Sequence, residues 1–297
     1  MIIQIDDDFD LDRIADSGQC FRWERLDPEE ESPHGTGRRE RLDPEEESSH
    51  GTGRSAYRII AGAECLYLTD LGGGRYEFDC TREKYDGFWR KYFDLEENYR
   101  AIRGRIDPAS DPFLREAADH EKGIRILRQD PWEMLITFII SQNRNIPAIR
   151  RSVDMLSAAC GERKTDSRGR EYYAFPLPAA LRALSEEKLS DCRLGYRGKY
   201  VHAAAEAVCA GEIDLGSLLH ADEEKTMAEL TALFGVGVKV ASCVSLFGLH
   251  HTDAFPVDVW MKRILADQYP AGYPFEKYAP YNGICQQYMF AWYRHRE

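Results

Sequence analysis

Short apolar runs, each only a few residues long, mark the first eighty positions of the chain. Within them apolar and polar residues alternate, or β-branched and aromatic residues dominate, which is typical of strands. Three consecutive glycines at 72–74 favour a tight turn between the last two runs. We therefore expect an antiparallel sheet with one face exposed to water. The predicted strands are residues 1–5, 20–25, 57–61, 65–69 and 75–78.

Helical periodicity replaces this pattern after Thr81, which is placed to cap a helix that runs to about residue 95. The clearest later start is Asp130, followed by Pro131 at the first helical position and by Glu133 three residues after the cap. The run 132–140 is apolar nearly all round, which indicates a central core helix. Further helices are predicted to start near Asp111, Pro147, Glu224, Lys239 and Asn282.

These patterns predict an α+β fold class, with an N-terminal antiparallel β-sheet domain followed by an all-α domain. A chain of 297 residues with 43% hydrophobic content is long enough to bury a sizeable core. We place the domain boundary so that residues 1–115 form the sheet domain and residues 116–297 form the helical domain.

Residues 24–54 contain an internal duplication. The segment ERLDPEEESPHGTGR at 24–38 recurs at 40–54 as ERLDPEEESSHGTGR. It is rich in Glu, Ser, Pro and Gly and poor in apolar residues, so it buries too little surface to offset the entropy lost on folding. We predict a solvated, disordered loop without a site of its own; binding of a partner is the alternative.

Charge and cysteine content narrow the possible functions. The net charge of −12 disfavours a general polyanion binder, but residues 121–170 carry ten basic and six acidic side chains, so a local positive surface remains. Eight cysteines are scattered without a C-x-x-C pair, which argues against a zinc site or a disulfide framework and for a reducing cytoplasm. No apolar run approaches the roughly 18 residues of a membrane span, and the acidic N-terminus is unlike a signal peptide.

The stretch 233–258 is the strongest candidate for chemistry. A glycine-rich hairpin at 235–237 lies between two helical patterns, and the first N–H groups of the second helix favour a bound phosphate. Lys239 lies in this first turn, where the helix dipole does not favour a cation. In apolar surroundings such a lysine can lose its proton near neutral pH and become a nucleophile; an ordinary solvated lysine is the alternative. Asp258 supplies a carboxylate, although an Asp before an apolar run is also typical of an N-cap.

This stretch resembles the helix-hairpin-helix DNA glycosylases, and the spacing of Lys239 and Asp258 resembles their 8-oxoguanine DNA glycosylase branch. The resemblance implies that the all-α domain is a helix-hairpin-helix glycosylase domain. It also implies that Lys239 attacks the sugar and that Asp258 is essential for catalysis. The resemblance is carried further by PVDVWMKRI at 256–264, DPWEMLITFIISQNRNI at 130–146 and LGYR at 194–197.

The segment SGQCFRW resembles the SGQ-x-FRW signature of the same branch. By that resemblance the carbonyl of Gly18 accepts a hydrogen bond from N7–H of the damaged base, whereas normal guanine presents a bare acceptor there. The family also places a glutamine and a phenylalanine, here Gln286 and Phe290, against the extruded purine, with Cys243 as the opposite wall. From the residues alone, a turn glycine, a solvated glutamine and a core phenylalanine are the alternatives, and the adjacent Gln287 leaves the register open.

The resemblance also assigns residues to the strand opposite the lesion. Asn143 would fill the gap left by the flipped base, Tyr196 would wedge beside the orphaned cytosine, and Arg197 would hydrogen-bond it. A helix-terminating Asn and a core Tyr are the alternatives. The second cytosine-reading arginine of the family is Ala148 here, so we expect looser discrimination for cytosine. The predicted DNA contacts are Asn143, Tyr196, Arg197, Gly235, Val236 and Gly237.

The function that the resemblance implies is a bifunctional DNA repair glycosylase. It would excise 8-oxoguanine from double-stranded DNA and nick the strand 3′ to the lesion by β-elimination. We expect a cytoplasmic monomer that needs no metal and no organic cofactor, although a cation would be able to bridge the hairpin carbonyls and a phosphate. The alternatives are a related glycosylase for another damaged base and a non-catalytic DNA-binding module. The module has no need for both Lys239 and Asp258.

Overall fold

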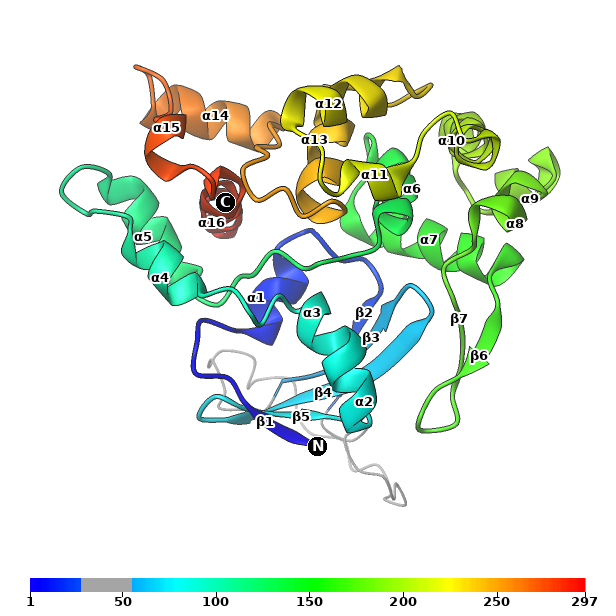
Figure 1. The fold of residues 1–297 in the computed structure, drawn as a ribbon, viewed down its shortest axis with the longest axis horizontal. Coiled ribbons are helices and arrows are strands. Elements are labelled where there is room, and N and C mark those ends of the chain that lie inside the picture. Colours follow the sequence, from blue (N-terminus) through cyan, green and yellow to red (C-terminus); the bar gives the residue numbers. More distant parts are fainter. Residues whose placement is uncertain (28–54, 297) are drawn as a thin grey trace, which may run out of the picture.

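The computed structural model describes residues 1–27 and 55–296 and contains a five-stranded antiparallel sheet that lies to one side of the helices (Figure 1). The strand order is β1-β5-β4-β3-β2, which confirms the predicted sheet. Alternating burial along β5 leaves every second side chain exposed, as expected for a sheet with one wet face. The strands are β1 (Ile2–Gln4), β2 (Trp23–Arg25), β3 (Ala56–Ala61), β4 (Glu64–Gly72) and β5 (Arg75–Phe78).

The segment after the sheet begins where predicted but is not one regular helix. The Thr81 hydroxyl accepts a hydrogen bond from the Lys84 amide at 3.3 Å, which confirms the cap. The next turn is π-helical and buries both Tyr85 and Trp89 against the sheet, and the helix ends three residues before the predicted residue 95. The elements are α1 (Leu11–Asp16), α2 (Arg82–Lys84), η1 (Tyr85–Trp89) and α3 (Arg90–Tyr92).

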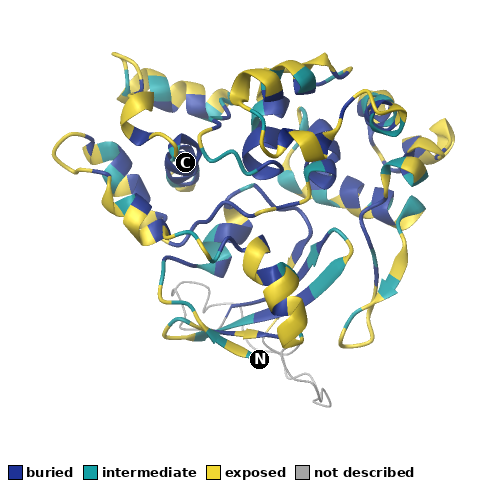
Figure 2. Ribbon diagram, in the orientation of Figure 1, coloured by how far each residue is buried: buried dark blue, intermediate teal, exposed yellow. Residues whose placement is uncertain are grey.

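Helix α6 (Pro131–Ser141) lies in the core of the helical lobe, as its all-round apolar pattern predicted. Every side chain from Trp132 to Ile140 is buried, so the helix has neighbours on all faces (Figure 2). Asp130 caps it by accepting a hydrogen bond from the Glu133 amide at 2.8 Å.

The Glu133 side chain, three residues after the cap, makes its contacts with the sheet lobe. Its carboxylate accepts a hydrogen bond from the Gly62 amide at 2.8 Å and lies 3.7 Å from the Arg22 guanidinium. Burial raises the pKa of this carboxyl, while Arg22 and the Gly62 amide oppose the rise. The residue therefore joins the helical lobe to the sheet instead of satisfying its own helix terminus.

A two-stranded hairpin, β6 (Arg163–Thr165) and β7 (Glu171–Tyr173), interrupts the region that was predicted to be almost wholly helical. The prediction missed it because both strands are only three residues long and mostly polar, so neither shows a strand period. Asp166 at the turn accepts hydrogen bonds from Arg58 and Tyr67, each at 2.9 Å, and so fastens the hairpin to the large sheet.

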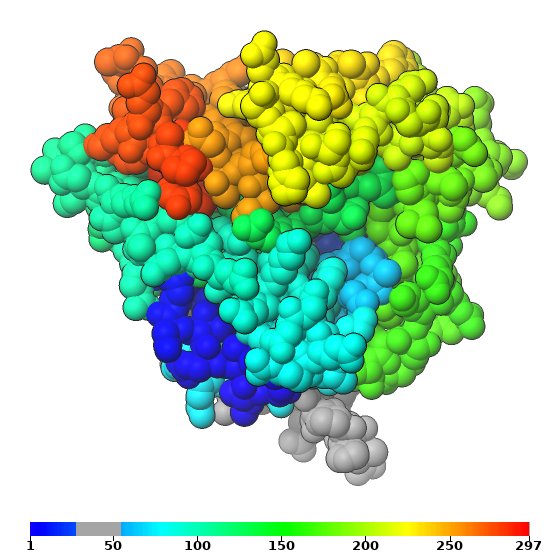
Figure 3. Space-filling model, in the orientation of Figure 1, coloured from blue at the N-terminus to red at the C-terminus, as the bar shows by residue number. Residues whose placement is uncertain are grey.

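The described residues bury two large apolar cores, one beneath the sheet and one among the helices. In the space-filling view the N-terminal residues, in blue and cyan, lie directly against the green, yellow and orange residues of the helical lobe (Figure 3). Helices α4 (Tyr99–Gly104) and α5 (Pro112–His120) precede the predicted domain boundary but belong to the larger, helical core, and α5 packs on α16. The boundary at 115/116 stays a prediction. Further helices are α7 (Ile146–Cys160), α8 (Pro178–Arg182), α9 (Glu186–Asp191), η2 (Gly195–Arg197), α10 (Gly198–Ala210), α11 (Leu215–Leu218), α12 (Glu223–Ala232), α13 (Val238–Phe247), α14 (Val259–Gln268), α15 (Phe275–Tyr278) and α16 (Asn282–His295).

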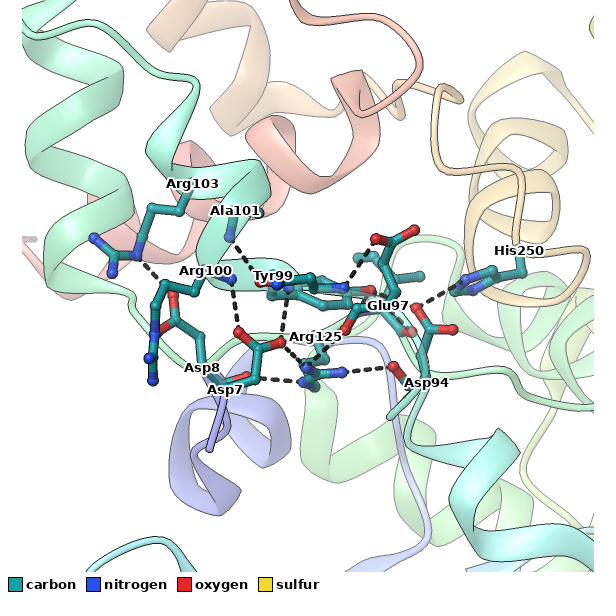
Figure 4. A network of polar contacts seen from close by, with 12 residues as sticks. Asp7, Asp8, Asp94, Glu97, Tyr99, Arg100, Ala101, Arg103, Arg125 and His250 are labelled. Carbon is teal, nitrogen blue, oxygen red and sulfur yellow. Dashed lines mark hydrogen bonds and ion pairs between the residues drawn. The ribbon is translucent and has the colours of Figure 1, made fainter. Parts of the chain in front are cut away.

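A buried network of charges joins the N-terminal segment to both lobes (Figure 4). The Arg125 side chain is fully buried and donates to the carbonyls of Asp8 at 2.8 Å and Asp94 at 2.6 Å, and to the Asp7 carboxylate. Asp94 in turn lies 3.2 Å from the imidazole of His250, which follows α13. The chain between α13 and α14 is thereby held to the segment that follows α3.

Two expectations concern the surface of the chain. Residues 28–54 of the predicted duplicated loop lie outside the described residues, but Glu24 and Arg25 form part of β2, so the predicted start of that loop at residue 24 was too early. Among the helices that the structure describes, none has the length and apolar character of a membrane span.

Candidate active site

The hairpin between α12 and α13 places a helix terminus at the surface. Gly235 adopts the left-handed conformation with φ of +83°, and the Val236 side chain is buried beneath it. Gly237 is the N-cap of α13 and has no side chain that would satisfy the first amides of the helix. These N–H groups and the positive end of the helix dipole are suited to a phosphate.

One face of α13 carries the predicted nucleophile. Lys239, Cys243 and Phe247 follow one another at intervals of four residues and line one cavity. The Cys243 thiol is buried, and this burial raises its pKa to about 11, so it is a neutral, apolar wall at physiological pH. Lys239 itself is exposed, which corrects the expectation that apolar surroundings within the chain enclose the amine.

Asp258 has both of the properties considered for it. It is the N-cap of α14, and its Oδ1 accepts a hydrogen bond from the Met261 amide at 2.9 Å. It also lines the same cavity as Lys239 and is half-buried there. A cap that fixes the carboxylate at a helix terminus orients it without removing its charge.

Helix α16 supplies the opposite wall. Gln286 and Gln287 are both buried, and the amide nitrogen of Gln287 donates to Oε1 of Gln286 at 3.1 Å. Among the described residues, Oε1 of Gln287 finds no hydrogen-bond partner although it is buried. Phe290, one turn further along the helix, is half-buried beside them. A buried acceptor without a partner next to a partly open aromatic ring is suited to a planar base that carries N–H groups.

The Gly18 loop closes the cavity from the N-terminal side. Gly18 has φ of +81°, and a Cβ at this position would lie 3.7 Å from the Phe290 ring. The adjacent Gln19 is fully buried and anchors the loop. Its amide donates to the Arg125 carbonyl at 2.8 Å, and its Oε1 accepts a hydrogen bond from the Leu127 amide at 2.8 Å. The position of the Gly18 carbonyl is therefore set by buried hydrogen bonds.

The structure brings all six residues predicted for catalysis and base recognition to one cavity of about 70 Å³. Phe138 and Phe247 stack at 5.5 Å and form an apolar part of its lining that was not predicted. Phe247 was within reach of sequence reasoning, because it continues the four-residue spacing of Lys239 and Cys243. The lining residues are Ser17, Gly18, Phe138, Lys239, Cys243, Phe247, Pro256, Asp258, Gln286, Gln287 and Phe290.

The residues predicted to contact the opposite strand form a second, more exposed group. Asn143 is exposed and adopts φ of +51°, and its amide donates to the Tyr196 hydroxyl at 3.2 Å. Gln142, beside it, donates to the Gly235 carbonyl at 3.1 Å. The loop after α6, the turn before α10 and the hairpin are therefore connected at the surface.

Arg197 is buried instead of projecting beside Tyr196. Its guanidinium makes four hydrogen bonds to backbone carbonyls: two to Gln142, one to Leu194 and one to Asn143. A guanidinium has five N–H groups, so one remains for the predicted contact with cytosine. Arg197 thereby supports the loop that carries Asn143.

Comparisons with known proteins match both lobes. Residues 2–135 match the family model "8-oxoguanine DNA glycosylase, N-terminal domain", and residues 136–272 match "HhH-GPD superfamily base excision DNA repair protein". A Clostridium acetobutylicum 8-oxoguanine glycosylase/lyase, solved with DNA containing cytosine opposite 8-oxoG, superimposes with a TM-score of 0.82 at 30% identity. That match covers 100% of this chain and 98% of the other. The chain belongs to the 8-oxoguanine DNA glycosylase family.

Curated members and relatives of the 8-oxoguanine DNA glycosylase family match shorter segments. N-glycosylase/DNA lyase OGG1 of Arabidopsis thaliana is 41% identical over 156 residues, which is 50% of this chain and 42% of that protein. A probable N-glycosylase/DNA lyase of Methanothermobacter thermautotrophicus is 30% identical over 64% of each chain. The chain thus spans less than two thirds of the length of these curated relatives. A 3-methyladenine DNA glycosylase of Archaeoglobus fulgidus, at 16% identity, shares the fold alone.

Proposed function

We propose that this chain is a bifunctional DNA glycosylase that removes 8-oxoguanine from double-stranded DNA and then nicks the strand 3′ to the lesion. The observation that carries the proposal is that an amine, a helix-capping carboxylate, a glycine carbonyl loop and a glutamine–phenylalanine wall line one cavity. Binding of DNA alone requires a phosphate site but no carboxylate beside a lysine.

In the proposed reaction, the unprotonated Nζ of Lys239 forms a bond to C1′ of the flipped nucleotide. The bond between C1′ and N9 breaks, and the base leaves with a proton. Asp258 stabilises the positive charge that develops on the sugar, and its hydrogen bond with the Met261 amide holds it in place. The sugar then opens to a Schiff base with Lys239, loses a proton from C2′ and expels the 3′ phosphate.

Selection of the base rests on groups that exist before DNA arrives. The Gly18 carbonyl is proposed to accept N7–H of 8-oxoguanine and to repel the lone pair at N7 of guanine. The unpartnered Oε1 of Gln287 adds a buried acceptor beside Gln286. The cavity of about 70 Å³ is far below the size of a usual ligand pocket, so its walls have to move apart to admit the base. We expect the half-buried Phe290 ring beside Gly18 to take part in this movement.

The lyase step is tested with a lesion duplex in the presence of borohydride, which reduces the Schiff base to a stable amine. We expect a covalent adduct with the wild-type protein and none with Lys239→Gln. Because Lys239 is exposed, this substitution should leave the melting temperature and the binding of undamaged duplex unchanged. If the wild-type protein forms no adduct and excises no base, the chain is a DNA-binding module and the proposal is wrong.

The specificity is tested with duplexes that carry 8-oxoguanine, an alkylated purine or an oxidised pyrimidine, each opposite all four bases. Names among the more distant relatives include "DNA-3-methyladenine glycosylase" in Bacillus subtilis, so an alkylated purine is the closest competing substrate. Faster excision of 8-oxoguanine than of every other lesion supports the proposal. Faster excision of an alkylated purine contradicts the role given to the Gly18 carbonyl.

We further propose that the protein acts as a cytoplasmic monomer that reaches the nucleoid through DNA, without a metal or an organic cofactor. The described structure contains eight free cysteines, which suit a reducing compartment. The amine, the carboxylate and the backbone amides supply the nucleophile, the charge and the phosphate site that the chemistry requires. We expect activity to persist in the presence of a metal chelator. Sedimentation should give the mass of a single chain.

A further inference from the structure

Three aromatic rings form a ladder from the turn before α10 to the hairpin before α13. The Tyr196 and Tyr200 rings meet edge to face at 5.7 Å, and the Tyr200 and Phe234 rings meet edge to face at 5.0 Å. The two end members are exposed, Tyr196 at 46% and Phe234 at 59%, whereas Tyr200 between them is half-buried. Tyr200 therefore connects two surface residues that lie far apart in sequence.

The middle ring is fixed by the hairpin backbone. A Cβ on Gly235 would lie 2.2 Å from Cγ of Tyr200 and 2.4 Å from its Cδ1, distances that no side chain tolerates. The Tyr200 ring thus lies directly against the Cα of Gly235. This contact, together with the φ of +83°, requires glycine at this position independently of any phosphate.

A polar connection runs parallel to the ladder. Gln142 donates to the Gly235 carbonyl at 3.1 Å, and the neighbouring Asn143 donates to the Tyr196 hydroxyl at 3.2 Å. The ammonium group of Lys199 lies 5.4 Å from the Tyr200 ring centre and 5.7 Å from that of Phe234, so a cation covers the outer side of these two rings. The ring ladder and the amide pair join the same two sites.

We infer that Tyr200 is a positioning residue that holds the Tyr196 ring at a fixed place relative to the phosphate-binding hairpin. Binding of a backbone phosphate at the hairpin then sets the depth at which Tyr196 enters the base stack. Extrusion of the base is thereby coupled to the grip on the backbone. This inference rests on the proposed function, because the role of Tyr196 as a wedge is part of it. Edge-to-face ring pairs are worth about a three- to tenfold change in an equilibrium.

The test compares Tyr200→Leu with Tyr200→Phe, which keeps the ring. Two readouts follow extrusion without chemistry. One is the preference for a duplex with a tetrahydrofuran abasic site over an undamaged duplex. The other is the fluorescence of 2-aminopurine placed beside the lesion. Single-turnover excision gives the effect on the reaction. Tyr200→Leu should lower all three about three- to tenfold, and Tyr200→Phe should retain them.

A merely structural role would not give the next result. If Tyr200 acts through Tyr196, then Tyr200→Leu should have almost no effect in a Tyr196→Leu background, because the wedge is already gone. Tyr200→Leu should lower the melting temperature slightly, because a half-buried ring loses its contacts, while the affinity for undamaged duplex should stay near the wild-type value. Phe234→Leu changes the far rung at an exposed site and should give the same pattern at smaller amplitude, even if Tyr200→Leu impairs folding.

Additive effects of Tyr200→Leu and Tyr196→Leu, or an equal loss of affinity for undamaged and abasic duplexes, would overturn the inference. Failure of the proposed function has a different signature. In that case the wild-type protein excises no base, while the abasic-site preference and its loss in Tyr200→Leu still report on the ladder.

Discussion

The two regions proposed to face DNA differ in how their side chains are held. The wall proposed to meet the base is built from buried groups: Gln19 fixes the Gly18 loop by hydrogen bonds to the chain at 125–127, and Gln286 and Gln287 are hydrogen-bonded to each other. The surface proposed to meet the opposite strand is more exposed, and Asn143 reaches Tyr196 through a single hydrogen bond of 3.2 Å.

This difference indicates that the two tasks place different demands on order. Under the proposed function, the distinction between 8-oxoguanine and guanine depends on the position of the Gly18 carbonyl, so this carbonyl has to be fixed before the base arrives. Filling a gap in the stack depends on surface area, and DNA itself completes the packing around exposed rings. Substitutions in the wall should therefore reduce excision or lesion preference more than substitutions in the strand-facing surface.

The largest effect is expected for Asp258→Asn. Asparagine caps a helix about as well as aspartate, so the hydrogen bond to Met261 and the stability of α14 should persist. Loss of the negative charge should slow single-turnover excision about 10²- to 10³-fold. Asp258→Ala, the matched control, should be equally slow and also less stable by about 1 kcal/mol. If the Asp258→Asn variant excises the base at the wild-type rate, Asp258 serves only as a helix cap and has no role in catalysis.

A test of the fixed wall itself is Gln19→Leu. The substitution leaves the Leu127 amide and the Arg125 carbonyl without their buried side-chain partner. We expect the free energy of unfolding to fall by roughly 2–3 kcal/mol in urea titrations. The preference for 8-oxoguanine over other lesions should fall more than the rate of excision. An unchanged preference at reduced stability would show that the Gly18 carbonyl does not depend on this anchor.

Gly18→Ala probes the carbonyl more locally. The left-handed φ of +81° is unfavourable for alanine, and the new methyl group would touch the Phe290 ring at 3.7 Å. The strain of about 1 kcal/mol should appear as a lower melting temperature. The ratio of excision of 8-oxoguanine to that of other lesions should fall about tenfold. Gly73→Ala, at a turn glycine with φ of +65° far from the cavity, controls for the strain alone.

The charge network between the lobes predicts a pH dependence. Burial opposes the charge on Asp94, but His250 and Arg128 outweigh it, so the pKa of this carboxyl lies below its ordinary value. A lowered pKa in the folded state stabilises the protein above the ordinary value, and this stabilisation is lost as the pH falls through the folded value. Asp94→Asn should be less stable by about 1 kcal/mol at neutral pH, with the difference shrinking below about pH 4. A difference that does not change with pH would contradict this account.

The smallest effect is expected on the strand-facing surface. Ala148 is half-buried at the start of α7, where the family has a second arginine that reads cytosine. Ala148→Arg should raise the preference for cytosine opposite the lesion about three- to tenfold. Ala148→Gln, which adds a side chain without the charge, should raise it less. Equal preference in all three proteins would show that Arg197 alone sets the choice of the opposite base.

Much of the fold was predictable because its patterns are local. The apolar run of α6 and the caps at Thr81 and Asp130 were read from neighbouring residues, and each was confirmed. The β6–β7 hairpin was missed because its short polar strands gain their stability from Asp166, which binds a sheet that is far away in sequence. The partners of Glu133 were not predicted for a similar reason, since Gly62 and Arg22 are equally remote in sequence.

The site likewise has features that were predictable from neighbouring residues and features that depend on residues remote in sequence. The order of the hairpin, Lys239 and Asp258 was visible in sequence, and the four-residue spacing placed Cys243 on the face of Lys239. The exposure of Lys239 was only the alternative reading of the sequence, and the bonding of the Arg197 guanidinium to backbone carbonyls was not predicted. Both depend on how separate elements meet, which no local pattern records.

The contact between Gly18 and Phe290 has a consequence for synthesis of the protein. The Arg294 side chain on α16 donates a hydrogen bond to the Asp16 carbonyl at the end of α1. Two walls of the cavity, the Gly18 loop and the Phe290 face of α16, therefore come from early and late parts of the polypeptide. A nascent chain without α16 would lack Gln286, Gln287 and Phe290, and it would also lack the core side chains of Tyr288 and Met289. The cavity can therefore form only after α16 has been synthesised and has packed against the N-terminal loop.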